Sequence, residues 1–186
     1  MEEIKAEGRT GYKFPINCTN MEEHHQEIIN TYGNKIRVRV CGLLFRNSDI
    51  LLVKHLTIGK NIFFYAPPGG GIDFGESAEE SLIREFHEET GLKVRIKSFL
   101  LTHEYLEPPL HAIELFFEVE EIGGTLSLGK DPEMGLDNQI IKEVKFWSLL
   151  EIKKNDAGLF HNIFRLAKTK SELLNLKGYF LHKGND

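Results

Sequence analysis

Cysteine and long apolar runs are both scarce in this sequence. Only two cysteines occur among 186 residues, Cys18 and Cys41, so no disulfide framework is expected to support the fold. No apolar run approaches the roughly 20 residues that cross a bilayer. The first thirty residues are polar and charged, unlike a signal peptide. We therefore expect a cytoplasmic protein with no membrane partner.

A basic surface is also missing from the sequence. The formal net charge is −5, whereas proteins that bind nucleic acids usually have a basic surface. We therefore expect no nucleic-acid partner. A small nucleotide substrate is still compatible with this charge, because a bound metal ion can neutralise phosphate locally.

The composition is that of one globular domain. Hydrophobic residues make up 41% of the chain and charged residues 27%, which is ordinary for a globular protein of this length. We predict an N-terminal arm over residues 1–34, with a short helix at 21–32 that ends at Gly33. The main domain is predicted over residues 35–186, including a C-terminal helical tail.

Hydrophobic alternation predicts most of the strands. A hairpin is expected where alternating apolar and basic residues from Ile36 to Phe45 are followed by a polar turn and a second apolar run. The same argument predicts further strands over residues 92–107, 111–122 and, leading into a helix, 143–152. The prolines at 108–109 must interrupt the ladder, since proline cannot lie inside one.

Two later segments complete the predicted fold. The glycine-rich stretch 123–139 is expected to be a long loop, and loops of that length are often functional. Residues 158–170 are predicted to form a helix with Leu159, Ile163 and Leu166 on one face. Strands on both sides of a mid-chain helix, followed by a late helix, predict an α/β fold around a mixed sheet.

The mid-chain helix has clear signals at both ends. Ser77 is a suitable N-cap and Gly91 a suitable left-handed stop, so we expect a helix over residues 78–90. Its first turn carries two glutamates, where the helix dipole favours negative charge. Farther along, Glu85, Glu88 and Glu89 have the spacing i, i+3 and i+4, which places three carboxylates on one face.

Three neighbouring carboxylates repel one another unless a cation lies between them. Oxygen ligands suit a hard cation such as Mg²⁺ or Mn²⁺. Arg84 and Glu76, eight residues apart, could form an ion pair that orients the ligands. The alternative is an ordinary exposed acidic helix face, which is the more common role of such a run.

The wider spacing separates these two interpretations. Gly70 is followed by five residues and Glu76, then by seven residues and the run REFHEETGL, which ends at Leu92. This stretch resembles the box of the Nudix hydrolase family at all nine specified positions within 23 residues. The resemblance implies an α/β/α sandwich and a hydrolase that acts on phosphoric anhydride bonds in a nucleoside diphosphate linked to another moiety.

The resemblance also implies roles for individual residues. The implied metal is Mg²⁺, for which Mn²⁺ can substitute. Its expected ligands are Gly70, Glu85, Glu88 and Glu89, with Glu76 as an outer-shell carboxylate or a ligand of a third metal ion. Arg84 matches the arginine that orients the helix carboxylates, so Arg84, Glu85, Glu88 and Glu89 are the expected catalytic residues. The general base is less well defined. We name Glu133 for this role, with Asp137 and Glu104 as the other candidates.

Substrate choice depends on residues outside the box. Pro108 lies 16 residues after Leu92. In the family, a proline at about this position is associated with ADP-ribose or a similar nucleotide sugar as the substrate. Pro108 and Pro109 could equally form a simple hairpin turn. The alternatives are a (deoxy)nucleoside triphosphate or dinucleoside polyphosphate pyrophosphatase, or a non-catalytic Nudix-fold regulator that senses a nucleotide. A homodimer is left open.

Overall fold

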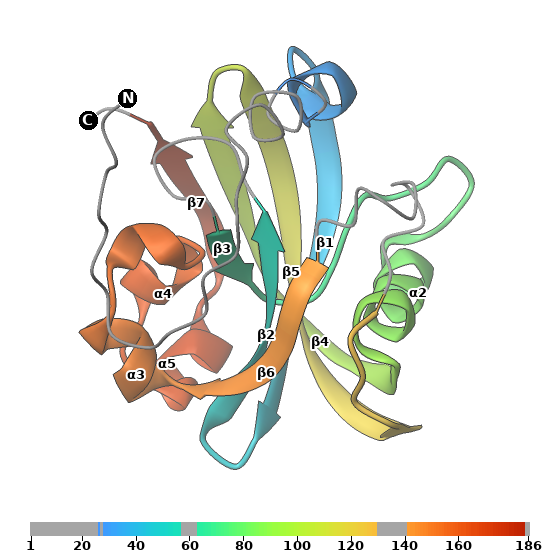
Figure 1. Cartoon of the computed structure of the whole chain (residues 1–186), viewed down its shortest axis with the longest axis vertical. Helices are drawn as coiled ribbons and strands as arrows, with labels where there is room; N and C mark the ends of the chain where they lie inside the picture. The colour runs from blue at the N-terminus through green and yellow to red at the C-terminus, as the bar shows by residue number, and fades with distance from the viewer. Residues whose placement is uncertain (1–25, 27, 57–62, 130–140, 185–186) are drawn as a thin grey trace, which may run out of the picture.

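A computed structural model describes residues 26, 28–56, 63–129 and 141–184. Its seven strands form one mixed sheet in the order β3-β2-β1-β5-β4-β7, with β6 paired to β2 (Figure 1). The pairs β1–β5 and β4–β7 are parallel and the others antiparallel. The strands are β1 Ile36–Arg46, β2 Asp49–Leu56, β3 Phe63–Ala66, β4 Leu92–Glu107, β5 Leu110–Gly124, β6 Ile141–Ser148 and β7 Gly178–Lys183.

Helices cover both sides of the strands, as the predicted α/β/α sandwich requires. Helix α2, Ala78–Thr90, lies on one side (Figure 1). The other side carries α3 Leu149–Lys154, the 3₁₀ turn η2 Ala157–Leu159, α4 Ile163–Leu166 and α5 Lys170–Asn175.

Strand β1 contributes to both hydrophobic cores because its side chains alternate between the two faces. Val40 and Leu44 pack with Phe86 of α2, whereas Cys41 and Leu43 belong to the core under the C-terminal helices. Each of these side chains is almost fully buried, and such burial contributes roughly 1.5–3 kcal/mol for a leucine or phenylalanine. Cys41 is a free, buried cysteine.

Strands β1 and β2 diverge soon after their hairpin turn. The two strands pair only at Phe45↔Ile50 and Arg46↔Asp49 within the described residues. On its other edge, β1 pairs with β5 along its length, from Ile36↔His111 to Leu44↔Val119. The divergence leaves one edge of β1 for the loop that follows β3.

The local sequence signals predicted several elements correctly. The hairpin of β1 and β2, helix α2 and the passage from β6 into α3 all lie where they were expected. Residues 92–107 form one strand, and Pro108 and Pro109 occupy the turn between β4 and β5. The two prolines therefore form a hairpin turn, and the relation of Pro108 to substrate choice stays a prediction.

The single helix predicted over residues 158–170 is wrong. The structure has η2, α4 and the first residue of α5 there, because Phe160 is extended after η2. Phe160 forms a bridge with Tyr65 of β3, and the His161 N–H donates to the Tyr65 carbonyl at 2.9 Å. These backbone bonds to a distant strand replace the hydrogen bonds of a continuous helix.

Three further differences concern the ends of predicted segments. The tail contains α5 but ends in a strand, β7, which pairs with β4. The loop predicted from residue 123 begins at residue 125, since β5 continues to Gly124. Residues 28–32 are helical, and the predicted start at residue 21 lies outside the described residues. No helix in the described part of the chain is long and apolar enough to cross a membrane.

Candidate active site

Helix α2 positions the predicted site, and local bonds define both of its ends. The Ser77 hydroxyl accepts from the Glu80 N–H, and the Glu80 carboxylate accepts from the Ser77 N–H, which completes a capping box. At the other end Gly91 has φ 70°, and its N–H donates to the His87 carbonyl. The register of the helix, and with it the direction of each glutamate, is therefore well determined.

The glycine-rich loop before α2 runs along the edge of β1 that β2 leaves open. The Val40 N–H donates to the Gly70 carbonyl and the Gly42 N–H to the Pro68 carbonyl, both at 2.9 Å. The Ile72 N–H donates to the Val38 carbonyl at 3.1 Å. The loop is thus hydrogen-bonded to the sheet like an additional short strand.

Two glycines of this loop lie where a side chain would not fit. A Cβ on Gly69 would be 1.9 Å from the Val40 carbonyl oxygen, and the φ of Gly69 is 150°. A Cβ on Gly70 would be 2.3 Å from Oε1 of Glu85. The backbone of the loop therefore lies directly against a carboxylate of α2.

Two of the helix carboxylates, Glu85 and Glu89, contact this loop, and Arg84 links Glu88 to Glu85. The Gly69 N–H donates to Oε2 of Glu89 at 2.9 Å, and this bond is buried. Arg84 Nη1 donates to Oε1 of Glu85 at 2.9 Å and to Oε2 of Glu88 at 3.2 Å. The side chains of Glu89, Glu85 and Glu88 are 7%, 12% and 29% exposed, so the cluster extends from the interior to the surface.

Arg84 also connects the helix to the loop before it. Its Nη2 lies 3.0 Å from Oε2 of Glu76, and its Nε donates to the same carboxylate at 3.2 Å. Nη2 also contacts the Gly71 carbonyl at 3.4 Å and lies 3.4 Å from Asp73. The structure therefore brings together all the predicted site residues from Gly70 to Glu89.

The electrostatic environments of these carboxylates differ. Burial raises the pKa of Glu85, repulsion by Glu88 adds to this, and Arg84 and Arg39 lower it in part. For Glu76 the hydrogen bonds from Arg84 and then Ser81 lower the pKa. The main cause of the raised pKa of Glu85 is therefore burial, and repulsion within the carboxylate cluster is the smaller contribution.

A divalent metal ion fits this set of donors. Glu85, Glu88 and Glu89 offer oxygen atoms only, as Mg²⁺ and Mn²⁺ prefer. The Gly70 carbonyl accepts from Val40, and its second lone pair is available for an ion. The close approach of Gly70 to Glu85 places that carbonyl and the carboxylates in one region.

Of the three candidates for the general base, only Glu104 is among the described residues. Glu133 and Asp137 lie outside the described residues. Glu104 is on β4, where its carboxylate accepts from Nε2 of His111 at 2.7 Å and from the hydroxyl of Tyr179. Its partners therefore lie on β5 and β7 and not on α2.

One histidine of the site was not predicted from the sequence. Nε2 of His55, on β2, lies 4.0 Å from Oε1 of Glu89. Burial, with a further contribution from Arg39, lowers the pKa of His55 to about 3, so the imidazole is neutral at physiological pH. Its position depends on how β2 and α2 approach each other, which no local spacing indicates.

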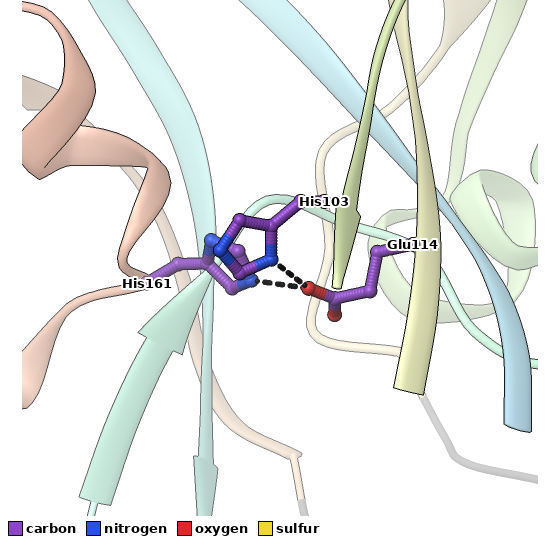
Figure 2. A group of neighbouring side chains, drawn as sticks. All are labelled: His103, Glu114 and His161. Atoms are coloured by element: carbon purple, nitrogen blue, oxygen red, sulfur yellow. Dashed lines mark hydrogen bonds and ion pairs between the residues drawn. The ribbon is translucent and has the colours of Figure 1, made fainter. Parts of the chain in front are cut away.

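A second buried polar cluster consists of His103, Glu114 and His161 (Figure 2). Both imidazoles point to the same oxygen of Glu114, with His103 Nδ1 at 2.9 Å and His161 Nε2 at 2.8 Å (Figure 2). Burial alone would raise the pKa of Glu114, but His161, His103 and Arg39 together lower it. The residues come from β4, β5 and the segment before α4, so sequence spacing did not indicate them.

These three side chains could also be considered as a metal site, since their ligand atoms lie within 4.8 Å of one another. The hydrogen bonding of His161 argues against this. Its Nδ1 accepts from the Ile163 N–H at 3.1 Å, so in the neutral ring the proton is on Nε2, which faces Glu114. A metal-binding histidine normally donates from its other nitrogen. The cluster is therefore better described as a hydrogen-bond network.

Comparisons with known proteins agree with this geometry. The family model described as NUDIX domain matches residues 35–166. An ADP-ribose pyrophosphatase of Methanocaldococcus jannaschii is 34% identical over 128 residues, which is 59% of this chain and 73% of the relative.

Two solved structures share the fold. The MutT protein from Methanosarcina mazei has a TM-score of 0.56 at 19% identity, over 71% of this chain and 89% of that one. An ADP-ribose pyrophosphatase from Streptococcus suis has a TM-score of 0.53 at 18% identity, over 77% of this chain and 98% of that one. The chain therefore belongs to the NUDIX domain family and is a Nudix hydrolase that acts on pyrophosphate bonds.

Proposed function

We propose that this hydrolase uses Mg²⁺, or Mn²⁺ in its place, to cleave ADP-ribose or a similar nucleotide sugar. The observation that carries the proposal is the contact of Glu85 and Glu89 with the glycine loop, with Glu88 linked to Glu85 through Arg84. The substrate class is supported by the 34% identity to a relative named ADP-ribose pyrophosphatase. Cleavage of ADP-ribose at its pyrophosphate bond would consume one water and give AMP and a sugar phosphate.

Each residue of the site would have a distinct role. Glu85, Glu88 and Glu89 would supply the carboxylate ligands, with the Gly70 carbonyl beside them. Arg84 would fix two of these carboxylates through the hydrogen bonds described above and would keep Glu76 in the surrounding shell. A bound ion would polarise the phosphoryl oxygens and lower the pKa of a water molecule.

Several expectations stay predictions. Glu133 is still our proposed general base, because Glu104 has its hydrogen-bond partners elsewhere. The division of the chain after residue 34, a cytoplasmic location, a homodimer and the absence of nucleic-acid and membrane partners are likewise retained from the sequence.

The proposed function can be tested with a panel of substrates. Product release would be measured from ADP-ribose, other nucleotide sugars, nucleoside triphosphates and dinucleoside polyphosphates, with Mg²⁺, with Mn²⁺ and with a chelator. We expect ADP-ribose or another nucleotide sugar to have the highest kcat/KM, and the chelator to abolish turnover. Preference for triphosphates or dinucleoside polyphosphates would favour those alternatives. Failure to cleave any compound would favour the regulator.

A further inference from the structure

The cluster of His103, Glu114 and His161 continues to Arg39, and we call these four residues the buried polar network. Arg39 and Glu114 are direct neighbours on the paired strands β1 and β5. Nε of Arg39 lies 3.8 Å from Oε1 of Glu114, the oxygen that the histidines do not contact. One carboxylate oxygen of Glu114 thus contacts the two imidazoles, and the other lies near the guanidinium of Arg39.

Glu114 is held firmly in this arrangement. Its side chain is only 8% exposed, and a buried carboxylate is costly unless it is paired and hydrogen-bonded. His161 is fixed at both ring nitrogens, by the Ile163 N–H and by Glu114. His103 packs against the ring of Phe116, with 6.3 Å between centroids. Three separate chain segments therefore determine the direction of one carboxylate.

Arg39 connects the network to the glycine loop. Its Nη2 donates to the Gly69 carbonyl at 3.3 Å. Among the residues that the structure describes, the buried Nε of Arg39 has no hydrogen-bond partner, and its ion pair at that nitrogen is with Glu114 at 3.8 Å. Gly69 in turn donates its N–H to Glu89 at 2.9 Å. One loop residue therefore contacts both Arg39 and an expected metal ligand.

We propose that Glu114, supported by His103 and His161, is a positioning residue for hydrolysis. It orients Arg39, Arg39 fixes the Gly69 peptide, and Gly69 directs the carboxylate of Glu89 towards the metal site. This proposal rests on the proposed function for the metal role of Glu89. None of the four network residues belongs to the box between Gly70 and Leu92.

The primary test is the variant Glu114→Gln, with Glu118→Gln as its matched control on the same strand. Glu118 pairs with Lys97 away from the glycine loop. Mn²⁺ binding would be followed without substrate by the electron paramagnetic resonance signal of free Mn²⁺. Loss of an outer residue around a metal site typically weakens affinity by roughly 10- to 100-fold. We expect a loss of this size for Glu114→Gln and none for Glu118→Gln. Wild-type affinity in a folded Glu114→Gln protein would overturn the proposal.

A second variant covers the case in which Glu114→Gln does not fold. Arg39→Lys keeps a positive charge and leaves the bonds between Glu114 and the histidines in place, but it lacks the guanidinium that reaches Gly69. The Arg39 side chain is 25% exposed, so this exchange is expected to be tolerated. Weaker Mn²⁺ binding is expected, whereas unchanged binding would contradict the link through Gly69.

Amide exchange separates this proposal from the proposed function, because it needs no metal. The Gly69 N–H should exchange more rapidly in Arg39→Lys and Glu114→Gln than in the wild type, even if the wild type cleaves no nucleotide. Equal exchange rates would contradict the proposal. Stoichiometric metal in the purified wild-type protein that is retained in Glu88→Gln but lost in Glu114→Gln would overturn the hydrogen-bond network in favour of a metal centre at the two histidines.

Discussion

At the scale of single residues, the absence of side chains is as important to the site as the carboxylates are. Gly70 permits the carboxylate of Glu85 to lie against the loop, and Gly69 permits the loop to lie against β1. The two positions differ in what a methyl group would meet. At Gly69 it would meet backbone atoms of β1, whereas at Gly70 it would meet the end of a side chain that can move.

This difference gives a prediction for Gly70→Ala. The Glu85 carboxylate should rotate away from the loop, so the fold should persist, with a change in unfolding free energy of less than about 1 kcal/mol. Mn²⁺ affinity should fall on the order of tenfold or more. Gly71→Ala is the matched control, since its Cβ would meet only Arg37 Nη2 at an ordinary 3.6 Å. Equal Mn²⁺ affinities in the two variants would contradict this role of Gly70.

At the scale of elements, α2 combines a locally defined start with a buried face. The capping box at Ser77 and Glu80 satisfies backbone N–H groups that would otherwise lack partners. The buried face carries Leu82 and Phe86, and Glu89 lies beside them at the inner end of the site. A change at the N-cap should therefore affect stability and leave the chemistry of the carboxylates largely intact.

We predict that Ser77→Ala lowers the free energy of unfolding by about 0.5–2 kcal/mol. Urea unfolding followed by circular dichroism would measure this loss. Ser98→Ala, at an exposed position of β4, serves as the control and should have a much smaller effect. If both variants lost the same stability, the capping box would not be contributing as described.

The elements also show which parts of the fold were predictable. Helix α2 was predicted residue for residue because its cap, its stop and its apolar stripe are all local. The helix over 158–170 failed because Phe160 and His161 bond to β3, about a hundred residues earlier. Strand β7 was missed because its partner is the distant strand β4.

The candidate site divides in the same way. The helical spacing predicted that the carboxylates of α2 share one face, and the resemblance to the Nudix box implied that Gly70 lies with them. His55 and the buried polar network reach the site from β2, β1, β4, β5 and the segment before α4. Only the pairing register of the strands brings these residues together, and that register cannot be predicted from a single sequence.

At the scale of the whole molecule, Glu114 makes stability depend on pH. Burial alone would raise its pKa, but the two histidines and Arg39 lower it overall below the ordinary 4.5. A carboxylate whose pKa is lowered by folding contributes stability above its ordinary pKa. That contribution disappears as the pH falls through the folded value.

The corresponding prediction compares the wild type with Glu114→Gln in urea unfolding at a series of pH values. Near neutral pH the wild type should be more stable by about 1–3 kcal/mol, because the variant leaves buried polar groups poorly satisfied. Below 4.5 the difference should shrink, since the unfolded wild-type chain then takes up a proton that the variant cannot bind. A difference that stays constant or grows in this acidic range would contradict the ionised state of Glu114 in the fold.

The central proposal is that the carboxylates of α2 would bind the metal ion that assists hydrolysis of the pyrophosphate by water. The most direct test is the rate of ADP-ribose hydrolysis with Mg²⁺ by Glu88→Gln, compared with Glu79→Gln. Glu79 is an exposed glutamate in the first turn of the same helix. We predict that Glu88→Gln lowers kcat by on the order of 10²- to 10⁴-fold, and that Glu79→Gln retains the wild-type rate. Wild-type turnover by a folded Glu88→Gln protein would contradict the account.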